Sequence, residues 1–319
     1  MQLHFVMRVA SIALLAGSTG IASSQSFPYK PIRIVVPGTG GGTDLMARVI
    51  AHELAAPLGQ QVVIENRPTG VIPAQTVSRA QPDGYTLLMS GSGLWLAPFL
   101  QDKVPFDPAN DFSPITLAVG QPNVLAVHPS VATSVKELIA LAKARPGELN
   151  YASGSAGAAN HVAAELFKAK AGVAIVRVNY KGAAAGLNAL MSGEVQVMFV
   201  TAAAVVPHIK TGRVRALAVT SANPSALLPD LPTVAASGLP GYESTSIYGI
   251  FAPAKTPKPV ITRLNKEIIQ VLNKPDLKEK LISMGGEAVG SSPDQLAATV
   301  KSDMAIIGKL LKKTGIQAD

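Results

Sequence analysis

Four short segments of this 319-residue chain combine glycine with Ser, Thr, Asn or Lys in a way that suits anion binding. Each follows a run of apolar residues and precedes a helical pattern: "PGTGGGTD" (37–44), "SGSG" (90–93), "SGSAGAANH" (153–161) and "NYKGAAAG" (179–186). A helix N-terminus offers unpaired backbone N–H groups and a partial positive charge, and glycine lets an anion approach them closely. We therefore expect these turns to line an anion site, with purely structural turns as the alternative.

The first of these segments matches neither phosphate-binding pattern of nucleotide-binding proteins. Gly38, Gly40 and Gly41 are followed by Gly42 and Thr43, so the third glycine of G-x-G-x-x-G is missing. No Gly-Lys-Ser/Thr follows, as a P-loop would require. The segment predicts an anion site of unspecified type.

Patterns for catalysis and for metal binding are weak. A serine-hydrolase elbow needs G-x-S-x-G, but Ser153 stands where the first glycine before Ser155 belongs. The five histidines form no H-E-x-x-H pattern, and the chain has no cysteine for thiolate ligands, disulfides or nucleophilic chemistry. We expect no metal ion, no cofactor and no catalysis, with a hydrolytic enzyme as an alternative.

Composition and charge are those of a globular protein whose surface attracts small anions. Hydrophobic residues make up 48% of the chain and charged residues 15%, and the length suits two domains. The formal net charge is +8, but aromatic residues are only 5% and the basic residues are scattered. Nucleic-acid binding is therefore not expected. The basic surface fits the attraction of small anions, or is simply a solvated face.

The N-terminus has the layout of a secretory signal peptide. A short segment ends at Arg8, an apolar stretch runs from Val9 to about Ala16, and Ala22 and Ser24 suit the positions before a cleavage site. We expect residues 1–24 to be removed and the mature chain to act in the periplasm; an N-terminal anchor is the alternative. The absence of cysteine excludes a lipoprotein.

Short β-branched runs alternate with longer segments of helical periodicity. The runs predicted as strands are Ile32–Val36, Val62–Glu65, Thr86–Ser90, Val124–Val127, Leu149–Ala152, Ile175–Val178, Val195–Val200, Val214–Val219 and Ile247–Ala252. The predicted helices include Asp44–Ala56, Ser134–Ala144, Asn160–Ala171, Gly182–Ser192, Pro259–Leu272 and Pro293–Lys312. This alternation predicts an α/β fold with mostly parallel sheets flanked by helices.

So many strands favour two lobes over a single sheet. We expect one crossing near Gln121–Asn123 and a return near Ser244–Tyr248. The first lobe would then comprise residues 25–122 and 248–319, and the second residues 123–247. Ligands of open α/β sheets lie beyond the carboxyl ends of the strands or between domains, so the glycine-rich turns should line a cleft between the lobes.

Several longer motifs resemble those of the Bug proteins, also called the TctC family, which are periplasmic solute receptors of tripartite tricarboxylate transporters. The resemblance runs from about Tyr29 to Lys312. The segments that carry it are "FPYKPIRIVVP", "GGGTDLMAR", "VVIENRP", "QPDGYTLLMS", "SGSAGAANHVAAELFK", "YKGAAAGLNALMSGEVQVMF" and "PHIKTGRVRALAVTS".

This resemblance implies a periplasmic-binding-protein fold that closes about a hinge on a small organic carboxylate. The carboxylate would be held by loop amides and ordered waters, and the closed receptor, a monomer, would deliver it to integral-membrane transporter subunits. An alternative is a receptor that presents the same ligand to a sensor kinase.

The family's ligand-binding positions can be carried over onto both lobes. In the first lobe they are Thr39, Gly40, Gly41, Gly42, Thr43, Asp44 and Ser90. In the second lobe they are Ser153, Ser155, Gly157, Ala159, Asn160, His161, Tyr180 and Lys181, with Val200 and Thr201 at the end of a strand.

Three of these residues have an alternative structural interpretation. Asp44 is equally suited to cap a helix. His161 fits a buried anchor between loops slightly better than direct ligand contact. Lys181 would either attract the anion or simply hold its turn as an exposed side chain.

The chain also departs from the family pattern near the expected cleft. Gly38 stands where the family usually has an aromatic residue, Val200 and Thr201 stand where it often has an aspartate, and Val71 and Ile72 make the segment "RPTGVIPA" more apolar. A ligand amine would lose its charge partner, so an amino-acid ligand is not expected. A dicarboxylate, a tricarboxylate or an aromatic carboxylate fits better.

Overall fold

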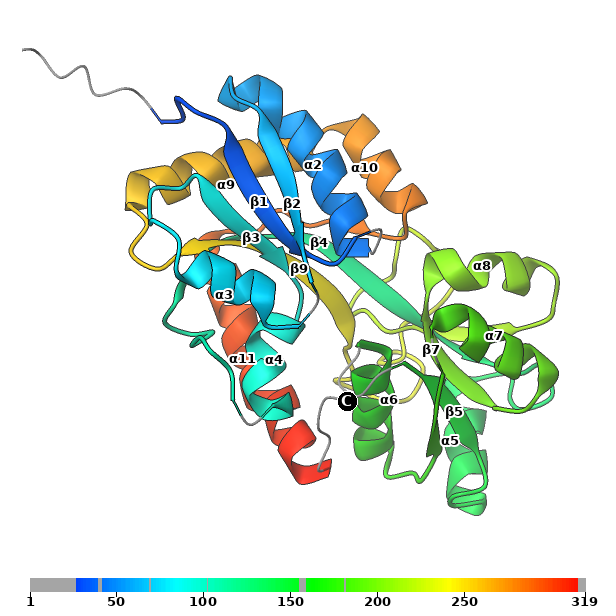
Figure 1. Cartoon of the computed structure of the whole chain (residues 1–319). Coiled ribbons are helices and arrows are strands. Elements are labelled where there is room, and N and C mark those ends of the chain that lie inside the picture. Colours follow the sequence, from blue (N-terminus) through cyan, green and yellow to red (C-terminus); the bar gives the residue numbers. More distant parts are fainter. Residues whose placement is uncertain are drawn as a thin grey trace, which may run out of the picture.

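The computed structural model describes residues 27–39, 42–68, 70–101, 103–154, 159–180 and 182–314. Within these ranges ten strands form one continuous, curled sheet in the order β2-β1-β3-β9-β4-β7-β5-β6, and both β8 and β10 pair with β4 (Figure 1). The strands are β1 (Ile32–Pro37), β2 (Val62–Arg67), β3 (Thr86–Ser90), β4 (Phe112–Val127), β5 (Asn150–Ser153), β6 (Val176–Asn179), β7 (Val197–Thr201), β8 (Arg215–Val219), β9 (Thr245–Pro253) and β10 (Glu287–Ala288).

Two groups of three parallel strands lie at the two ends of this sheet. At one end β1 pairs in parallel with β2 and β3, and at the other β5 pairs in parallel with β6 and β7. We call the parts built around them the first lobe and the second lobe. The strands between the groups are antiparallel to their neighbours, because β9 pairs with both β3 and β4, and β4 with both β7 and β8.

The long strand β4 belongs to both lobes. Its residues from Phe112 to Pro122 pair with β9, whereas those from Asn123 to Val127 pair with β7 and β8. The sequence pattern predicted only Val124–Val127 as strand, because Pro114, Gly120 and Pro122 argue against a regular strand. The register of β4 against β9 shifts between Pro114 and Thr116 and again between Leu117 and Val119, and these irregularities accommodate the breaks.

Helices cover both faces of the sheet in each lobe. They are α2 (Gly42–Leu58), α3 (Ile72–Ser78), α4 (Gly93–Leu100), α5 (Val135–Ala144), α6 (Ala159–Ala171), α7 (Ala183–Ser192), α8 (Ala202–Lys210), α9 (Lys258–Leu272), α10 (Pro275–Ser283) and α11 (Pro293–Thr314). The other predicted elements are found within a few residues of the predicted bounds, and the structure adds α3, α4, α8, α10 and β10.

Alternation along the strands explains why the sheet is covered by helices on both faces. In β1, Ile34 and Val36 pack into one core with α2, α9 and α10, while Val35 packs into a second core with α3, α4 and α11. In β7, Val197 and Phe199 likewise pack toward α5 and α6, whereas Met198 and Val200 pack toward α7 and α8. Period-two alternation of buried side chains requires a helical layer on each face.

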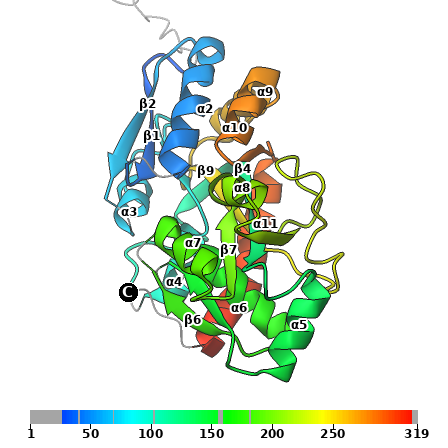
Figure 2. The same ribbon diagram turned by 90° about the vertical axis from the view of Figure 1, so that its right-hand side faces the viewer.

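The C-terminal helix α11 links the lobes on one side of the molecule. It packs against α4 and β4 in the first lobe and against α6 in the second, and Figures 1 and 2 both place it beside α6. The Trp95 Nε1 atom in α4 donates a hydrogen bond to Asp303 Oδ2 in α11 at 3.0 Å. This contact fixes α11 to the first lobe and leaves its other face toward the second.

Candidate functional site

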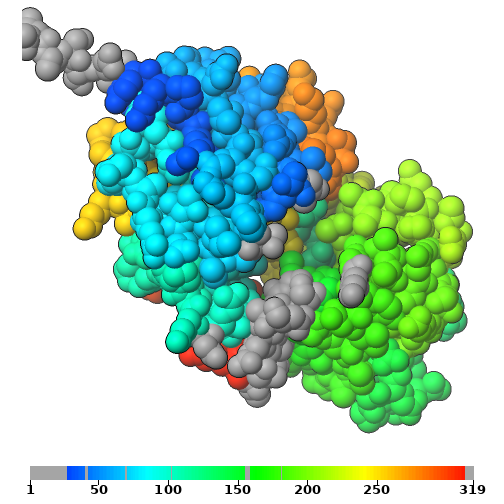
Figure 3. Space-filling model, in the orientation of Figure 1, coloured from blue at the N-terminus to red at the C-terminus, as the bar shows by residue number. Residues whose placement is uncertain are grey.

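Two cavities meet between the lobes at the ends of the parallel strands. The larger has a volume of about 400 Å³ and the smaller about 190 Å³, and Ala159, Ser246 and Tyr248 line both. Figure 3 shows the blue and cyan part of the first lobe and the green second lobe as two separate masses. The two cavities therefore adjoin each other at these three residues.

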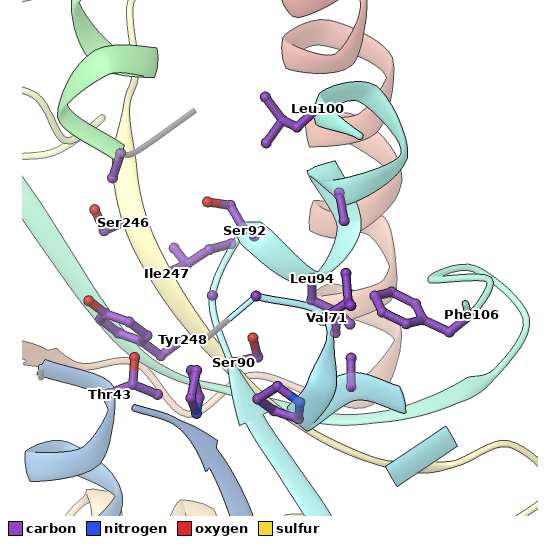
Figure 4. A pocket seen from close by; sticks show the side chains of 18 of the residues that line it. Thr43, Val71, Ser90, Ser92, Leu94, Leu100, Phe106, Ser246, Ile247 and Tyr248 are labelled. Carbon is purple, nitrogen blue, oxygen red and sulfur yellow. The ribbon is translucent and has the colours of Figure 1, made fainter. Parts of the chain in front are cut away.

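The larger cavity has a polar side and an apolar side. Figure 4 shows the hydroxyl groups of Thr43, Ser90, Ser92, Ser246 and Tyr248 on one side. The opposite side is made of apolar residues from α3, α4 and the segment that follows α4. Those labelled in Figure 4 are Val71, Leu94, Leu100 and Phe106. The cavity is therefore suited to a ligand with a polar group attached to an apolar body.

The smaller cavity lies against the second lobe and the strand that crosses between the lobes. Its polar residues are Gln121, Asn123, Asn160 and Thr201, together with the shared Ser246 and Tyr248. Its apolar wall comes from Ala183, Met198, Phe199 and Val200. The polar groups are again neutral, so this cavity offers hydrogen bonds without charge.

Helices from both lobes begin at these cavities. Thr43 at the start of α2 and Gly93 at the start of α4 line the larger cavity, and Ala183 at the start of α7 lines the smaller. Ala159, the first residue of α6, lines both. The positive ends of several helix dipoles thus lie around these two adjoining cavities, which favours an anion there.

Two hydroxyl side chains at helix starts are not used for capping. Ser92 is the N-cap of α4 and Thr201 is the N-cap of α8, and neither side chain caps its own helix. Both residues line the cavities. Their hydroxyl groups therefore add donors to those of the helix backbones.

Tyr248 joins the crossing strand to the first glycine-rich turn. Its hydroxyl donates a hydrogen bond to Gln121 Oε1 at 3.0 Å. Burial raises the pKa of Tyr248, and a hydrogen bond with Thr43 opposes that shift in part. Tyr248 is thus a neutral phenol near pH 7. A Cβ atom at Gly42 would lie 3.5 Å from its hydroxyl oxygen, so the start of α2 is close to this ring.

Charged side chains are absent from the lining of the two cavities, as far as the described ranges extend. No Asp, Glu, Lys, Arg or His belongs to that lining. Asp44 follows the lining residue Thr43 in the sequence, but its side chain is 2% exposed and is paired with other protein groups. Its Oδ1 atom lies 2.9 Å from Arg48 Nε and accepts a hydrogen bond from Asn66 Nδ2 at 2.9 Å. An anion in the cavities would therefore meet dipoles instead of formal charges.

The residues predicted as ligand contacts fall into three groups. Those that line the cavities are Thr43, Ser90, Ala159, Asn160, Val200 and Thr201. Those that are described but do not belong to the lining are Thr39, Gly42, Asp44, Ser153, His161 and Tyr180. Those that lie outside the described residues are Gly40, Gly41, Ser155, Gly157 and Lys181, as does the predicted signal peptide, residues 1–24.

Three predicted contacts of the second lobe interact with other protein groups. Ser153 is 2% exposed, and its Oγ atom accepts a hydrogen bond from Arg177 Nε at 2.8 Å. His161 is also 2% exposed, with Nε2 at 4.0 Å from a carboxylate oxygen of Glu165. The hydroxyl group of Tyr180 donates to Glu194 at 2.8 Å.

Six polar lining residues were missed by the sequence analysis. Gln121 and Asn123 lie on the predicted crossing, Ser246 and Tyr248 on the predicted return, Ser92 within the quoted "SGSG" segment, and Gln101 directly after α4. The crossing and the return were predicted, but which of their side chains face the cavities depends on strand pairing that the local sequence does not contain.

A third cavity, of about 340 Å³, lies between α6, the segment 241–246 and α11. Unlike the other two it has charged lining residues: Lys170, Glu243 and Asp303. Burial raises the pKa of Asp303 to about 6, the charge of Glu243 adds to that shift, and the hydrogen bond from Trp95 opposes it. We call it the rear cavity. It shares Ser92, Ala159, Ser246 and Ile247 with the larger cavity.

The described ranges contain neither a metal-binding cluster nor a membrane-spanning helix. No cluster of three or more His, Cys, Asp or Glu is placed there to hold a metal ion. No helix in those ranges combines the length and the hydrophobicity needed to cross a bilayer.

Comparison with known proteins shows one consistent family. Residues 46–316 match the TctC model, described as tripartite tricarboxylate transporter family receptor. Protein BugT of Bordetella pertussis is 34% identical over 316 residues, which cover 96% of this chain and 97% of that protein.

Solved structures give the same result. The structure of R. palustris Rpa4515 with adipate is 37% identical and covers 91% of this chain and 99% of its own, with a TM-score of 0.75. The periplasmic binding protein BugD is 33% identical, covers 92% of this chain and 100% of its own, and has a TM-score of 0.72. Both similarities extend over nearly the whole described fold.

Proposed function

This chain belongs to the TctC family of tripartite tricarboxylate transporter receptors, and we propose that it captures a small organic carboxylate between its two lobes and delivers it to a membrane transporter. The transporter subunits are the proposed partners, and the receptor acts as a monomer. It works in the periplasm after loss of residues 1–24, in keeping with the periplasmic relative BugD.

The convergence of helix N-termini on a neutral cavity carries this proposal. Starts of α2 and α4 from the first lobe and of α6 and α7 from the second face the same space. A carboxylate there would exchange water for fixed N–H and O–H donors, which are stronger in a water-poor cavity. Ligand contacts are proposed for the predicted residues that line the cavities, together with Ser92, Ser246 and Tyr248.

The lining supports a ligand that is an acid with a sizeable carbon body. The apolar side of the larger cavity would be poorly used by a very small anion, and the family relative Rpa4515 has been solved with adipate. The described lining has no carboxylate to pair with a ligand amine. We therefore place amino acids below dicarboxylates, tricarboxylates and aromatic carboxylates as ligands.

Ligand delivery would rest on hinge closure. We propose lobe boundaries at 25–122 with 248–319 and at 123–247, supported by the change of β4 partners between Pro122 and Asn123. The crossing strands would bend there, and a ligand that contacts both lobes would favour the closed form.

A thermal-shift screen tests this function. The chain from Gln25 onward would be mixed with adipate, succinate, malate, citrate, benzoate and hexanoate, and with glutamate and lysine as amino-acid comparisons. We expect a saturable rise in Tm with at least one acid and a smaller rise with the amino acids, because a ligand that binds only the folded state stabilises it. No rise with any acid, for protein freed of bound molecules by refolding, would contradict the proposal.

A further inference from the structure

The side-chain nitrogen of Asn123 stands out among the buried polar atoms of the described residues. It alone among those buried side-chain atoms has no hydrogen-bond partner there. Asn123 is 2% exposed and lines the smaller cavity. Burying an amide nitrogen without a hydrogen-bond acceptor costs free energy, so the presence of Asn123 at this position needs an explanation. A ligand oxygen in the smaller cavity would supply the missing acceptor.

The main chain around Asn123 is firmly held. Its backbone N–H donates to Thr220 Oγ1 at 2.8 Å, and its carbonyl accepts from the Thr220 N–H at 2.8 Å. In the ladder between β4 and β7 it lies opposite Thr201, which lines the same cavity. Because the backbone is fixed on both sides, the side chain of Asn123 starts from a fixed point at the cavity wall.

The surroundings leave few competing partners for this nitrogen. Met198, Val200 and Ala183 make an apolar wall, and Gln121 Oε1 already accepts the hydroxyl of Tyr248. Neutral amide hydrogens bind carboxylate, hydroxyl or carbonyl oxygens, whereas a methyl group offers them no acceptor. Asn123 Nδ2 is therefore a buried donor at the smaller cavity that has no partner among the described residues.

We propose that Asn123 is a specificity-determining residue whose Nδ2 atom donates a hydrogen bond to a second oxygen-bearing group of the ligand. This inference rests on the proposed function. One carboxylate of the ligand lies in the larger cavity among the helix starts, and the other end reaches the smaller cavity. The receptor therefore selects acids with a second oxygen acceptor, such as dicarboxylates, over monocarboxylates that end in a methyl group.

Asn123→Leu tests this role because leucine has a similar size and no donor. Asn265→Leu is the matched control, since Asn265 Nδ2 donates to Ile115 O at 2.8 Å and to Ser291 O at 2.9 Å. Without ligand, Asn123→Leu should keep or raise the Tm, whereas Asn265→Leu should lower it. A fall in Tm for Asn123→Leu as large as that of Asn265→Leu would mean a structural role and overturn the inference.

Ligand titrations complete the test. The probe is whichever of adipate, succinate, malate or citrate gives the wild type the largest thermal shift, compared with hexanoate and benzoate. Wild-type protein should bind the probe at least about tenfold more tightly than either monocarboxylate, and Asn123→Leu should lose that preference. Asn265→Leu should retain it.

The outcomes separate the two proposals. If hexanoate or benzoate binds the wild type as tightly as the probe, or if Asn123→Leu keeps the preference, the role of Asn123 is wrong and the carboxylate receptor stands. Tighter binding of 6-aminohexanoate than of adipate would also overturn it, because Asn123 would then act as an acceptor. If none of the acids binds, the proposed function fails and the role of Asn123 fails with it.

Discussion

The two cavities of the ligand site and the rear cavity share part of one wall and differ in how they handle charge. In the described lining of the ligand cavities all polar groups are neutral, and helices begin around them. The rear cavity contains Lys170, Glu243 and Asp303, and the pKa of Asp303 is raised to about 6. The proposed ligand cavities therefore offer an anion fixed dipoles, whereas the rear cavity holds side chains that can ionise.

Introducing a charge into the smaller cavity should have the largest effect. Val200 is 3% exposed and lines it, so Val200→Asp would put a carboxylate beside an anionic ligand. We expect the affinity for the best carboxylate to fall on the order of 100-fold by like-charge repulsion. Calorimetric titration would measure this, with Val200→Asn as the neutral control of similar shape. Equal losses in the two variants would show that charge does not matter there.

Removing the hydroxyl group of Tyr248 should have the next largest effect. Tyr248→Phe deletes the hydrogen bond to Gln121 and should lower stability by about 1 kcal/mol and affinity about fivefold. Tyr242→Phe is the matched control, because the Tyr242 hydroxyl donates to Ala163 O at 2.9 Å inside the second lobe. Denaturant unfolding and titration of both variants would check this. A loss of affinity in Tyr242→Phe as large as in Tyr248→Phe would argue against a local role.

Removing a charge from the rear cavity should change stability without changing affinity. The pKa of Asp303 is about 6 when folded against 3.8 for an ordinary aspartate, so the folded state holds its proton more tightly. The free energy of unfolding should therefore fall as pH rises from about 4 to about 6 and then stay lowered.

Asp303→Asn should flatten that dependence, and at pH 7 it should stabilise the protein on the order of 1 kcal/mol. The Asn side chain can still accept the hydrogen bond from Trp95. Denaturant unfolding at pH 4, 5, 6 and 7 would measure the slope, with the wild type beside it. If the unfolding free energy of both proteins changes equally with pH, the raised pKa of Asp303 is contradicted. A large loss of ligand affinity in Asp303→Asn would contradict the separation of the rear cavity from ligand binding.

A single methyl group at the start of α2 should have the smallest effect. In Gly42→Ala the new Cβ would lie 3.5 Å from the Tyr248 hydroxyl oxygen, an ordinary contact, so the fold should tolerate it. If the ligand approaches the backbone there, affinity should fall about threefold with the Tm unchanged or slightly raised. An unchanged affinity would move the ligand away from this turn.

The sequence predicted the turns of the site better than its strands. Ser90 is the last residue of β3, and Thr43, Ala159 and Asn160 lie in the first turns of the helices that follow β1 and β5. The carboxyl ends of parallel strands meet at one edge of a sheet, so the pattern predicted these turns near the cavities, and the resemblance to the family supplied the individual residues. Their contact with a ligand stays a prediction. Gly38 was taken as the loss of an aromatic ring, but its φ of +67° also gives glycine a conformational reason to be there.

The crossing strands were harder to predict for a physical reason. Prolines and a glycine interrupt β4, so its first part showed no strand pattern, and the direction of the Gln121 and Asn123 side chains could not be assigned. The sequence alone marks Tyr248 as an ordinary strand residue. Only the register of β9 against β4 places it beside the cleft. The positions that join the lobes depend on tertiary pairing, which local patterns do not contain.

Calorimetric titration with a carboxylate and its neutral amide tests the central claim most directly. The wild-type chain would be titrated at pH 7.5 with the acid chosen by the thermal-shift screen and with the matching primary amide. The account predicts saturable binding of the acid with one site per chain, and at least about tenfold weaker binding of the amide, because the helix N-termini favour negative charge. Equal affinity for acid and amide, or binding of the amide alone, would contradict it.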